Sequence, residues 1–470
     1  MFLKKYLALF DSNNEMNSIE TSAGRVTLFA LFVPIFVEQM LKSMMSTVNI
    51  FILGKFSDDA VASVGVASQV VNLQLMLYTV IGVGASIVIT QYMGAGNKKQ
   101  AKDVSSVSIV IVTMMGLVLG ILMAVFTKPL MELMQLEEKL LPDAIIFFQI
   151  ISVFSVFQAL IAVLSAISRS YGLAKISMMA ALIMNVFNAI GSYLVIYRPF
   201  EIPLYGVAGV AYCRVIAEII ALLIMLVIIW RNNLKFSFKC MFPFPKKTVV
   251  EIFKIGIPSG VDFLNYNIAQ MISTGIIAVL GGVAIASKIY VNNVVFYVYI
   301  FGLSLGQSTA LMVGWLVGAG KFDLAYRLNI RNLKVASVSN GLFSLIVYIF
   351  RYPIIGIFTK NKEIISLCAS ILLIDIFIEI FRGFNHVEQN SLRGAGDVRF
   401  PMIVSLCTCW TFSILLSYIL SIKFEMGLMG CWIAFGMEEM FRGNILLQRW
   451  RSKKWMQKAI VKNESLLKPN

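Results

Sequence analysis

Charged residues and histidine are scarce in this 470-residue sequence. Lysine, arginine, aspartate and glutamate together make up 14% of the chain, and His386 is the single histidine. A soluble domain contains about 25% charged residues, so this chain has too few to cover a globular surface of its size. One histidine and six scattered cysteines also argue against a metal-rich or disulfide-framed protein, and we expect no cofactor.

Long apolar runs take the place of the missing charges. Hydrophobic residues make up 59% of the chain, and a membrane-spanning helix needs about 20 mostly apolar residues. Twelve such windows can be read, roughly at 26–53, 60–93, 104–126, 143–167, 175–197, 205–230, 250–280, 284–317, 332–358, 364–391, 400–422 and 427–448. The sequence therefore predicts an all-α polytopic membrane protein with twelve transmembrane helices.

The net charge of +15 is concentrated in the short gaps between the apolar runs. Lysine and arginine in such gaps stay preferentially in the cytoplasm. Of the 40 basic residues, 27 lie in segments that twelve spans place on the same side as both termini, and eight lie in segments on the other side. We therefore expect a multi-pass protein of the plasma membrane with both termini in the cytoplasm. The positive charge then reports orientation rather than a nucleic-acid partner.

The sequence also repeats itself at an offset of 224 residues. This shift aligns Pro34 with Pro258 and Glu38 with Asp262, without a gap over the first two spans of each copy. The same offset aligns Gly94 with Gly318, and Arg169 with Arg393. An even number of spans per copy makes the repeats parallel, and transporters built in this way rock one half against the other. We expect two six-helix halves around a central cleft.

The repeat and the charge pattern together predict the domain organisation. A cytoplasmic segment 1–25 precedes a six-helix half 26–230, a cytoplasmic linker 231–249 comes next, and a second half 250–448 ends in a basic tail 449–470. The cleft between the halves is the natural site for a small-molecule drug or metabolite. The lipid bilayer is the other expected partner, and we expect a monomer.

Several motifs resemble the bacterial MATE family of multidrug and toxic compound extrusion transporters. They are GKFSDDAVASVGVASQ (54–69), QYMGAGNKKQAK (91–102), SLRGAGDVRFPM (391–402) and MGLMGCWIAF (426–435). The resemblance implies a secondary active multidrug efflux antiporter, which exports cationic or amphipathic small molecules in exchange for H⁺ or Na⁺. The alternative is a lipid-linked oligosaccharide flippase of the same superfamily, which predicts a strongly cationic cleft for a pyrophosphate headgroup.

Glu38 and Asp262 are the first candidates for the coupling or substrate site, because each lies four residues after the proline of its repeat within a span. An ionisable group in a span costs about 2.5–3.5 kcal/mol, which makes it a functional hypothesis by default. Burial disfavours a charged carboxylate, so such a group can exchange a proton near neutral pH or hold a cation. An i,i+4 ion pair with Lys42 is the alternative role for Glu38. Asn265 and Tyr266 lie close to Asp262 in the sequence.

Three positions depart from the pattern that the resemblance implies. The cation-coupling aspartate expected fifteen residues after the first proline is Asn49, and the acid expected in the seventh span is Tyr266. The acid expected in the tenth span falls near Arg382, with Glu379 one turn earlier. His386, in the same span, has an ordinary pKa near 6.5, which suits a proton relay. The alternative is a buried polar network that fixes helix packing. Na⁺ at the same carboxylates is the alternative to H⁺.

One motif points to a different class of protein. Residues 302–306 match the G-x-S-x-G pattern of serine hydrolases, and an intramembrane serine protease would pair Ser304 with His386. That pattern requires a sharp turn at the serine, whereas Ser304 lies inside an uninterrupted apolar run. We therefore expect a transporter rather than an enzyme.

Overall fold

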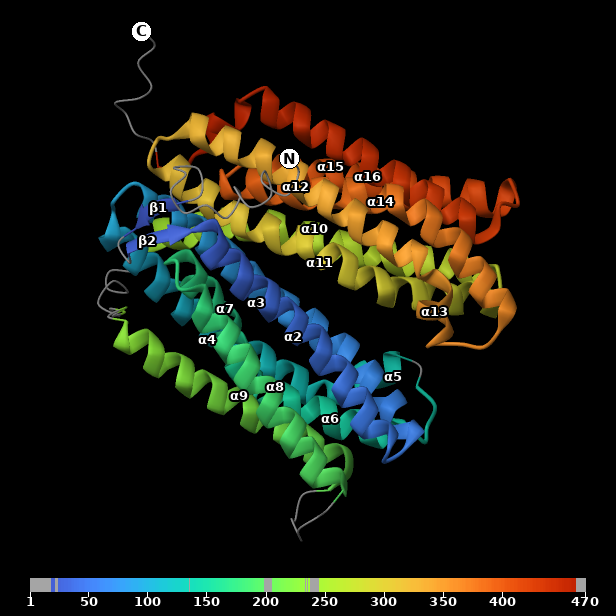
Figure 1. The fold of residues 1–470 in the computed structure, drawn as a ribbon. Coiled ribbons are helices and arrows are strands. Elements are labelled where there is room, and N and C mark those ends of the chain that lie inside the picture. The colour runs from blue at the N-terminus through green and yellow to red at the C-terminus, as the bar shows by residue number, and fades with distance from the viewer. Residues whose placement is uncertain are drawn as a thin grey trace. The chain divides into compact units, whose positions relative to one another are not determined.

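The structure is a computed structural model that describes residues 18–21, 24–134, 136–197, 205–232, 234, 236 and 245–461. A small antiparallel hairpin of β1 (Ser18–Thr21) and β2 (Gly24–Thr27) precedes the first helix, and long helices make up most of the chain after it (Figure 1). Most of the predicted segment 1–25 and of the predicted linker 231–249 lies outside the described residues.

The helices coincide with the twelve predicted spans. In the first repeat they are α2 (Leu28–Gly54), α3 (Asp58–Gly94), α4 (Lys98–Val125), the pair α6 (Leu141–Val153) and α7 (Ser155–Ser170), α8 (Ala174–Tyr197) and α9 (Gly206–Arg231), with a short α5 (Thr127–Leu133). In the second they are α10 (Lys246–Val279), α11 (Gly282–Gly318), α12 (Phe322–Ile349), α14 (Lys362–Gly394), α15 (Arg399–Thr408) and α16 (Gly427–Arg451), with a short α13 (Arg351–Gly356). The helix of α15 continues through two π-helical stretches, Cys409–Leu416 and Ile419–Lys423.

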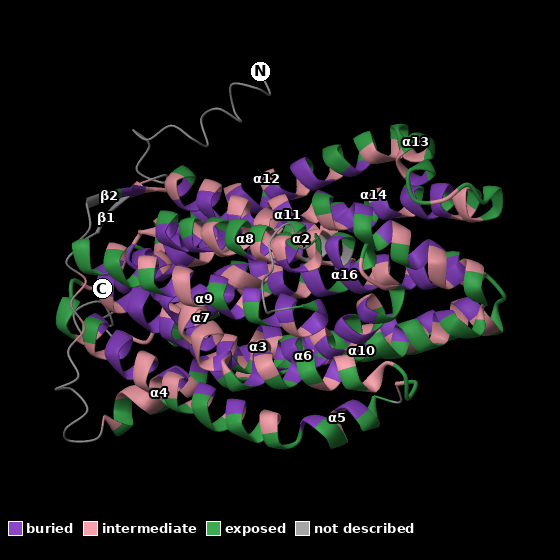
Figure 2. Ribbon diagram, turned by 90° about the horizontal axis from the view of Figure 1, so that it is seen from below, coloured by how far each residue is buried: buried purple, intermediate pink, exposed green. Residues whose placement is uncertain are grey.

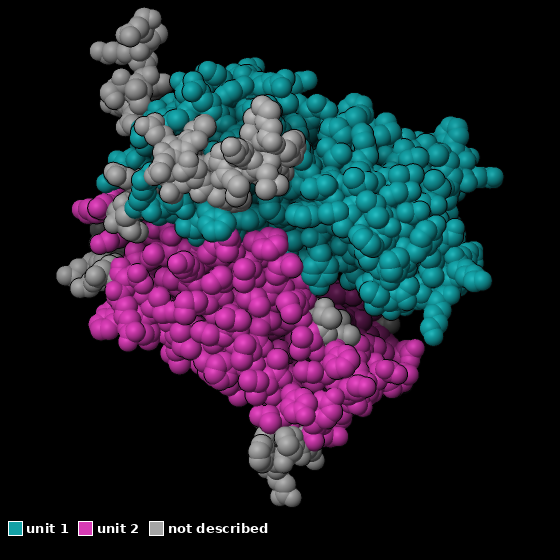
Figure 3. Space-filling view, viewed as in Figure 1, with its two compact units in different colours: residues 1–32, 90–96, 258–470 teal, residues 33–89, 97–257 magenta. Residues whose placement is uncertain are grey.

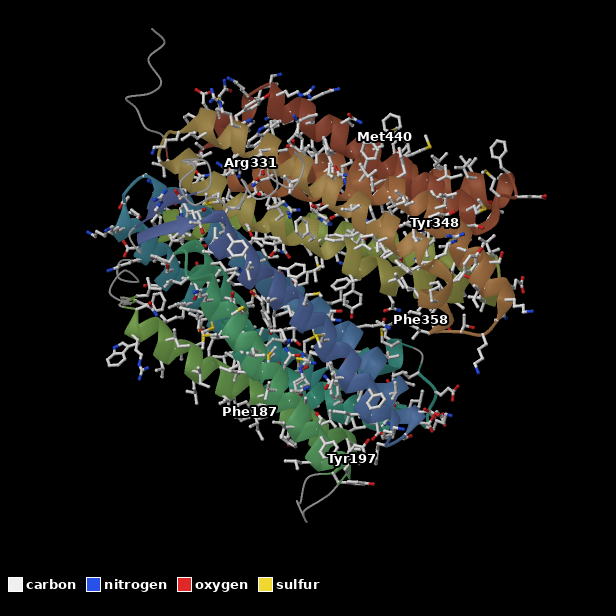
Figure 4. The ribbon with its side chains drawn as sticks, in the orientation of Figure 1. Phe187, Tyr197, Arg331, Tyr348, Phe358 and Met440 are labelled. Atoms are coloured by element: carbon white, nitrogen blue, oxygen red, sulfur yellow. The ribbon has the colours of Figure 1, made fainter. Side chains whose placement is uncertain are left out.

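Most of these helices are built to cross a bilayer. Within the described residues, nine are long and apolar enough to do so, and the bent pair α6–α7 makes a tenth. The other two long segments, α10 and α16, carry more polar residues. On α8, Phe187 and Tyr197 point away from the neighbouring helices (Figure 4) and are 45% and 46% exposed, as suits a lipid-facing surface. The predicted all-α, multi-span fold is confirmed.

The fourth predicted span is not one straight helix, because the chain bends by 54° between α6 and α7. Opposite the break, α4 presents Gly116 and Gly120, and a Cβ at Gly120 would crowd the carbonyl oxygen of Ser152 and the hydroxyl of Ser155. Ser155 also accepts a hydrogen bond from the Tyr78 hydroxyl at 3.0 Å. Close packing on small residues of α4 and this buried polar contact both lie at the bend.

The chain forms two compact units, which Figure 3 shows in different colours. Unit 1 contains the described residues up to Phe32, residues 90–96 and those from Pro258 onward, and unit 2 contains residues 33–89 and 97–257. The divisions in α2 and α10 fall beside Pro34 and at Pro258. A proline inside a helix lacks an N–H donor and disturbs the preceding turn, so each unit boundary falls near a position where the helix is locally weakened, although both helices continue through it. The predicted boundaries near 230 and 250 stay predictions.

Each unit has its own apolar core, and single helices alternate between buried and exposed faces (Figure 2). In unit 2 the core lies where α3, α6 and α9 meet, and includes Val71, Phe148 and Val215. In unit 1 it lies where α11, α14 and α16 meet, and includes Leu372 and Trp432. The buried polar side chains of each unit are therefore held by closely packed helices.

Within unit 1, the ends of α3 and α11 cross through residues related by the repeat. A Cβ at Gly94 would overlap the carbonyl oxygen of Trp315, and a Cβ at Gly318 would overlap that of Gln91. Because the offset of 224 relates Gln91 to Trp315 and Gly94 to Gly318, the crossing uses the same two positions of each repeat. Only glycine permits so close an approach of two backbones.

The start of α14 offers a simple test of the helix boundaries. Asn361 caps this helix, its Oδ1 accepting hydrogen bonds from the backbone N–H groups of Glu363 and Ile364 at 2.9 and 3.4 Å. Asn361→Ala is expected to lower the free energy of unfolding by about 1 kcal/mol, measured by thermal denaturation in detergent. Asn267→Ala, inside α10, is the control and removes no cap; an equal loss in both variants would contradict the assignment.

Candidate functional site

Unit 2 contains a partly open cavity of about 550 Å³. Helices α2, α3, α6, α7, α8 and α9 contribute to its wall. Two of the predicted site residues, Glu38 and Asn49, line it. The charged side chains among its described lining residues are Glu38, Lys42, Arg169, Arg214 and Glu218.

Glu38 is held by two cations inside this cavity. Its side chain is 4% exposed and lies 2.7 Å from Lys42 Nζ, so the i,i+4 ion pair considered from the sequence does form. A second partner comes from the far end of α7, where Arg169 Nη1 donates to both carboxylate oxygens, at 3.0 and 2.9 Å. The sequence alone did not predict this contact, which spans 131 residues.

Other polar contacts order the rest of the cavity wall. Asn49 Oδ1 accepts a hydrogen bond from Asn188 Nδ2 on α8, at 2.7 Å. On α9, Arg214 Nε lies 3.2 Å from Glu218 Oε1. The position at which the resemblance implied an acid is thus a neutral amide, held by a second amide.

Asp262 in unit 1 has a similar arrangement. It is 4% exposed, forms an ion pair with Arg393 and accepts a hydrogen bond from Gln389, both on α14. Asp262 and Arg393 are the repeat mates of Glu38 and Arg169. Each repeat therefore pairs the acid that comes after its first proline with an arginine at the end of its fourth span.

The two predicted neighbours of Asp262 lie apart from this pair. Asn265 is buried, and its Oδ1 accepts a hydrogen bond from Trp410 Nε1 at 3.0 Å. Tyr266 is 45% exposed, and its hydroxyl accepts a hydrogen bond from Gln270 Nε2 at 3.4 Å. Neither makes a described hydrogen bond with Asp262.

A larger charged cluster joins α14 to α16 and includes the predicted Glu379 and Arg382. We call it the acidic network; its members are Asp375, Glu379, Arg382, Glu438, Glu439 and Arg442. Arg382 forms an ion pair with Glu379, and its Nε lies 3.4 Å from Glu439 Oε1. Arg442 lies 3.1 Å from Glu438 and 2.7 Å from Glu439. The four acids are at most 5% exposed.

Neutral partners complete the acidic network. Asn385 Nδ2 donates to Glu439 Oε2 at 2.5 Å, and Thr408 Oγ1 donates to Glu438 Oε1 at 3.0 Å. One oxygen of Asp375, Oδ2, has no hydrogen-bond partner within the described residues. The network thus contains four carboxyl groups and two guanidinium groups in a buried region.

Sequence reasoning passed over several of these acids. Glu438 and Asp375 were not selected, although the spacing of Glu438 and Glu439 before Arg442, four and three residues, is a usable signal for ion pairing along a helix. Glu388 on α14 is also fully buried and accepts a hydrogen bond from Asn329 Nδ2 at 3.0 Å. It forms no ion pair among the described side chains.

His386 lies beside the acidic network, with its ring 5.8 Å from that of Tyr299. Its buried Nε2 atom and the buried hydroxyl of Ser304 each have no hydrogen-bond partner in the part of the chain that the structure describes. Ser304 lies well inside α11, without the sharp turn that a hydrolase nucleophile needs. The pair that a serine protease requires is therefore not formed here.

Metal-ligand geometry is the remaining question for these carboxyl groups. Within the described residues, no three or more His, Cys, Asp or Glu side chains are grouped so that they could hold a metal ion.

Two sets of membrane-spanning helices related by a sequence repeat are an architecture that many membrane transporters share. The chain belongs to the MatE family, whose sequence pattern matches residues 34–194 and 258–419. The two matches begin at Pro34 and Pro258, the pair that defines the offset of 224.

Known relatives agree with this family. The chain is 37% identical to the uncharacterized transporter YisQ of Bacillus subtilis, over 93% of this chain and 96% of that protein. It is 24% identical to the probable multidrug resistance protein NorM of Thermotoga maritima, over 96% and 97% of the two chains. The predicted resemblance to the MATE family is confirmed.

Solved structures share the fold at low sequence identity. The chain resembles the outward-facing conformation of a multidrug resistance MATE family transporter of the MOP superfamily, with a TM-score of 0.85 at 18% identity over 92% of this chain and 96% of the other. It also resembles a MOP superfamily transporter from Pyrococcus furiosus, for which reversed polarity of the binding pocket suggests a different function, with a TM-score of 0.84 at 18% identity and the same coverage.

Proposed function

We propose that the protein is an antiporter of the plasma membrane, with both termini in the cytoplasm, that exports amphipathic small molecules in exchange for protons. The observation that carries this proposal is the acidic network of α14 and α16. Two guanidinium groups cannot neutralise four carboxylates, and an unpaired charge in a low-dielectric interior is strongly disfavoured. The network is therefore expected to hold protons, and to release them when the conformation changes its contact with water.

Protons suit this network better than Na⁺. Guanidinium, amide and hydroxyl groups already contact Glu379, Glu438 and Glu439, so few of their oxygens are left to surround an ion. Protonation needs one free lone pair, which the unpartnered oxygen of Asp375 supplies. Glu388, which forms no ion pair among the described side chains, is a second protonation site of the same helix.

The cavity of unit 2 is the proposed substrate site. It combines apolar wall residues such as Leu53, Phe147 and Val210 with amide groups such as Asn72 and Gln158. Concave sites that bind small molecules have this composition, mostly apolar with a few polar groups. The mixed charges of the wall favour drug efflux over flipping of a lipid-linked pyrophosphate, which needs a strongly cationic site.

Transport by purified protein in liposomes tests the proposal. An imposed proton gradient is expected to drive exchange of a fluorescent amphipathic dye, and an imposed sodium gradient is not. Asp375→Asn is expected to reduce proton-driven exchange by about 5–150-fold, the range of typical coupling free energies, while dye binding remains. Glu363→Gln, at the exposed start of α14, is the matched control.

Two results would overturn the proposal. One is transport driven by sodium alone. The other is proton-driven transport that is unchanged in Asp375→Asn and in Glu388→Gln, each shown to be folded by size-exclusion chromatography.

A further inference from the structure

The charge balance of the unit 2 cavity is positive. Three cationic side chains, Lys42, Arg169 and Arg214, line it together with two acids, Glu38 and Glu218. All five belong to unit 2, so the balance is a property of that unit alone. The remaining described lining residues are neutral.

The pairing within the cavity shows which cation is left in excess. Arg214 lies against Glu218 at 3.2 Å. Arg169 donates to both oxygens of Glu38, so Lys42 has only a share of a carboxylate that already has a partner. The side chain of Lys42 is 52% exposed, compared with 21% for Arg169 and 16% for Arg214. Lys42 is therefore the most exposed cation of the cavity, and the only acid it contacts, among the described lining residues, is shared with Arg169.

We propose that this cavity selects amphipathic molecules that carry an anionic group, a carboxylate above all, and that Lys42 binds that group. The inference rests on the proposed transport function and deepens it by naming the substrate class. It differs from the cationic substrates that the family resemblance implies. A cationic ligand would meet three cations, and both acids that could receive it are already in ion pairs. An anion at Lys42 instead neutralises the excess charge and forms a charge-assisted hydrogen bond.

Asn49 is a second feature of the wall that favours an anion. The resemblance implied an aspartate at this position, and that acid would bring the described cavity charges to balance. Here the position is a neutral amide bound to Asn188. The replacement of an acid by an amide, and the presence of Lys42, both shift the cavity toward anionic ligands.

A pair of dyes that differ in one group provides the test: a xanthene dye with a free carboxylate and the methyl ester of the same dye. Binding to purified protein is measured by fluorescence polarisation, and exchange is measured in proteoliposomes. The carboxylate form is expected to bind about tenfold or more tightly than the ester, the range for one hydrogen bond to a charged group. Lys42→Gln is expected to remove this preference, and Lys42→Arg to retain it.

Two further variants separate a binding role from a structural one. Asn49→Asp keeps an acceptor for Asn188 and adds a negative charge, so it is expected to weaken binding of the carboxylate form and leave the ester unaffected. Lys128→Gln removes an exposed lysine outside the cavity and is expected to change neither. If the wild-type protein binds both dyes equally, or if Lys42→Gln weakens both equally, the inference is wrong although the transport proposal stands. Failure to bind or transport either dye would count against the transport proposal as well.

Discussion

Replacing Arg442 with methionine is expected to lower the free energy of unfolding by about 3–5 kcal/mol, the usual cost of leaving a buried charge without its partner. Arg442 contacts Glu438 at 3.1 Å and Glu439 at 2.7 Å, and it is 6% exposed. Methionine fills similar space but supplies no positive charge. The measurement is the unfolding midpoint of purified protein in detergent, compared with that of the wild type.

A triple variant distinguishes the loss of the ion pairs from the loss of side-chain packing at position 442. Adding Glu438→Gln and Glu439→Gln to Arg442→Met removes the two acids that form ion pairs with the guanidinium group. The triple variant is expected to recover most of the lost stability. Arg451→Met, at the exposed end of the same helix, is the control. A loss as large in Arg451→Met, or no recovery in the triple variant, would show that the ion pairs of Arg442 do not stabilise the fold.

The second large effect is expected at the crossing of α3 and α11. Gly318→Ala places a methyl group on the carbonyl oxygen of Gln91, and Gly94→Ala does the same to Trp315. Neither overlap can be relieved by rotating a side chain, because the obstructing atom belongs to a backbone. Each variant is expected to lose about 1–3 kcal/mol or more, the cost of overpacking, measured by the same thermal method.

Gly275→Ala is the matched control for both glycine variants. Gly275 lies inside α10, and nothing lies within 4 Å of the Cβ that the substitution would add. Alanine in a helix interior is favoured over glycine by about 0.5–1 kcal/mol, so this variant is expected to be slightly more stable than the wild type. If Gly318→Ala is as stable to thermal unfolding as Gly275→Ala, the backbones of α3 and α11 are not in contact.

The sequence predicted the spans and the repeat because both are carried by local pattern. An apolar run indicates a membrane span whichever helices pack beside it. The offset between Pro34 and Pro258 can likewise be read from the sequence without any tertiary contact. The bend between α6 and α7 was missed; the glycines that pack against it, Gly116 and Gly120, belong to another helix. Hydropathy alone does not indicate which helix a small residue will face.

The same distinction applies to the charged side chains. The pair Glu38–Lys42 was accessible from i,i+4 spacing, whereas Glu38–Arg169 joins residues 131 positions apart. Alignment of the repeats placed Arg169 on Arg393 and Glu38 on Asp262, but it could not show that each arginine would contact the acid of its own repeat. Long-range pairing depends on helix packing, which a single sequence does not display.

The unit boundaries beside Pro34 and at Pro258 bear on whether either half of the chain could be expressed alone. Unit 1 takes the start of α2 from the first repeat, and unit 2 takes the start of α10 from the second. A half-chain expressed alone would therefore lack the segment that completes its own unit.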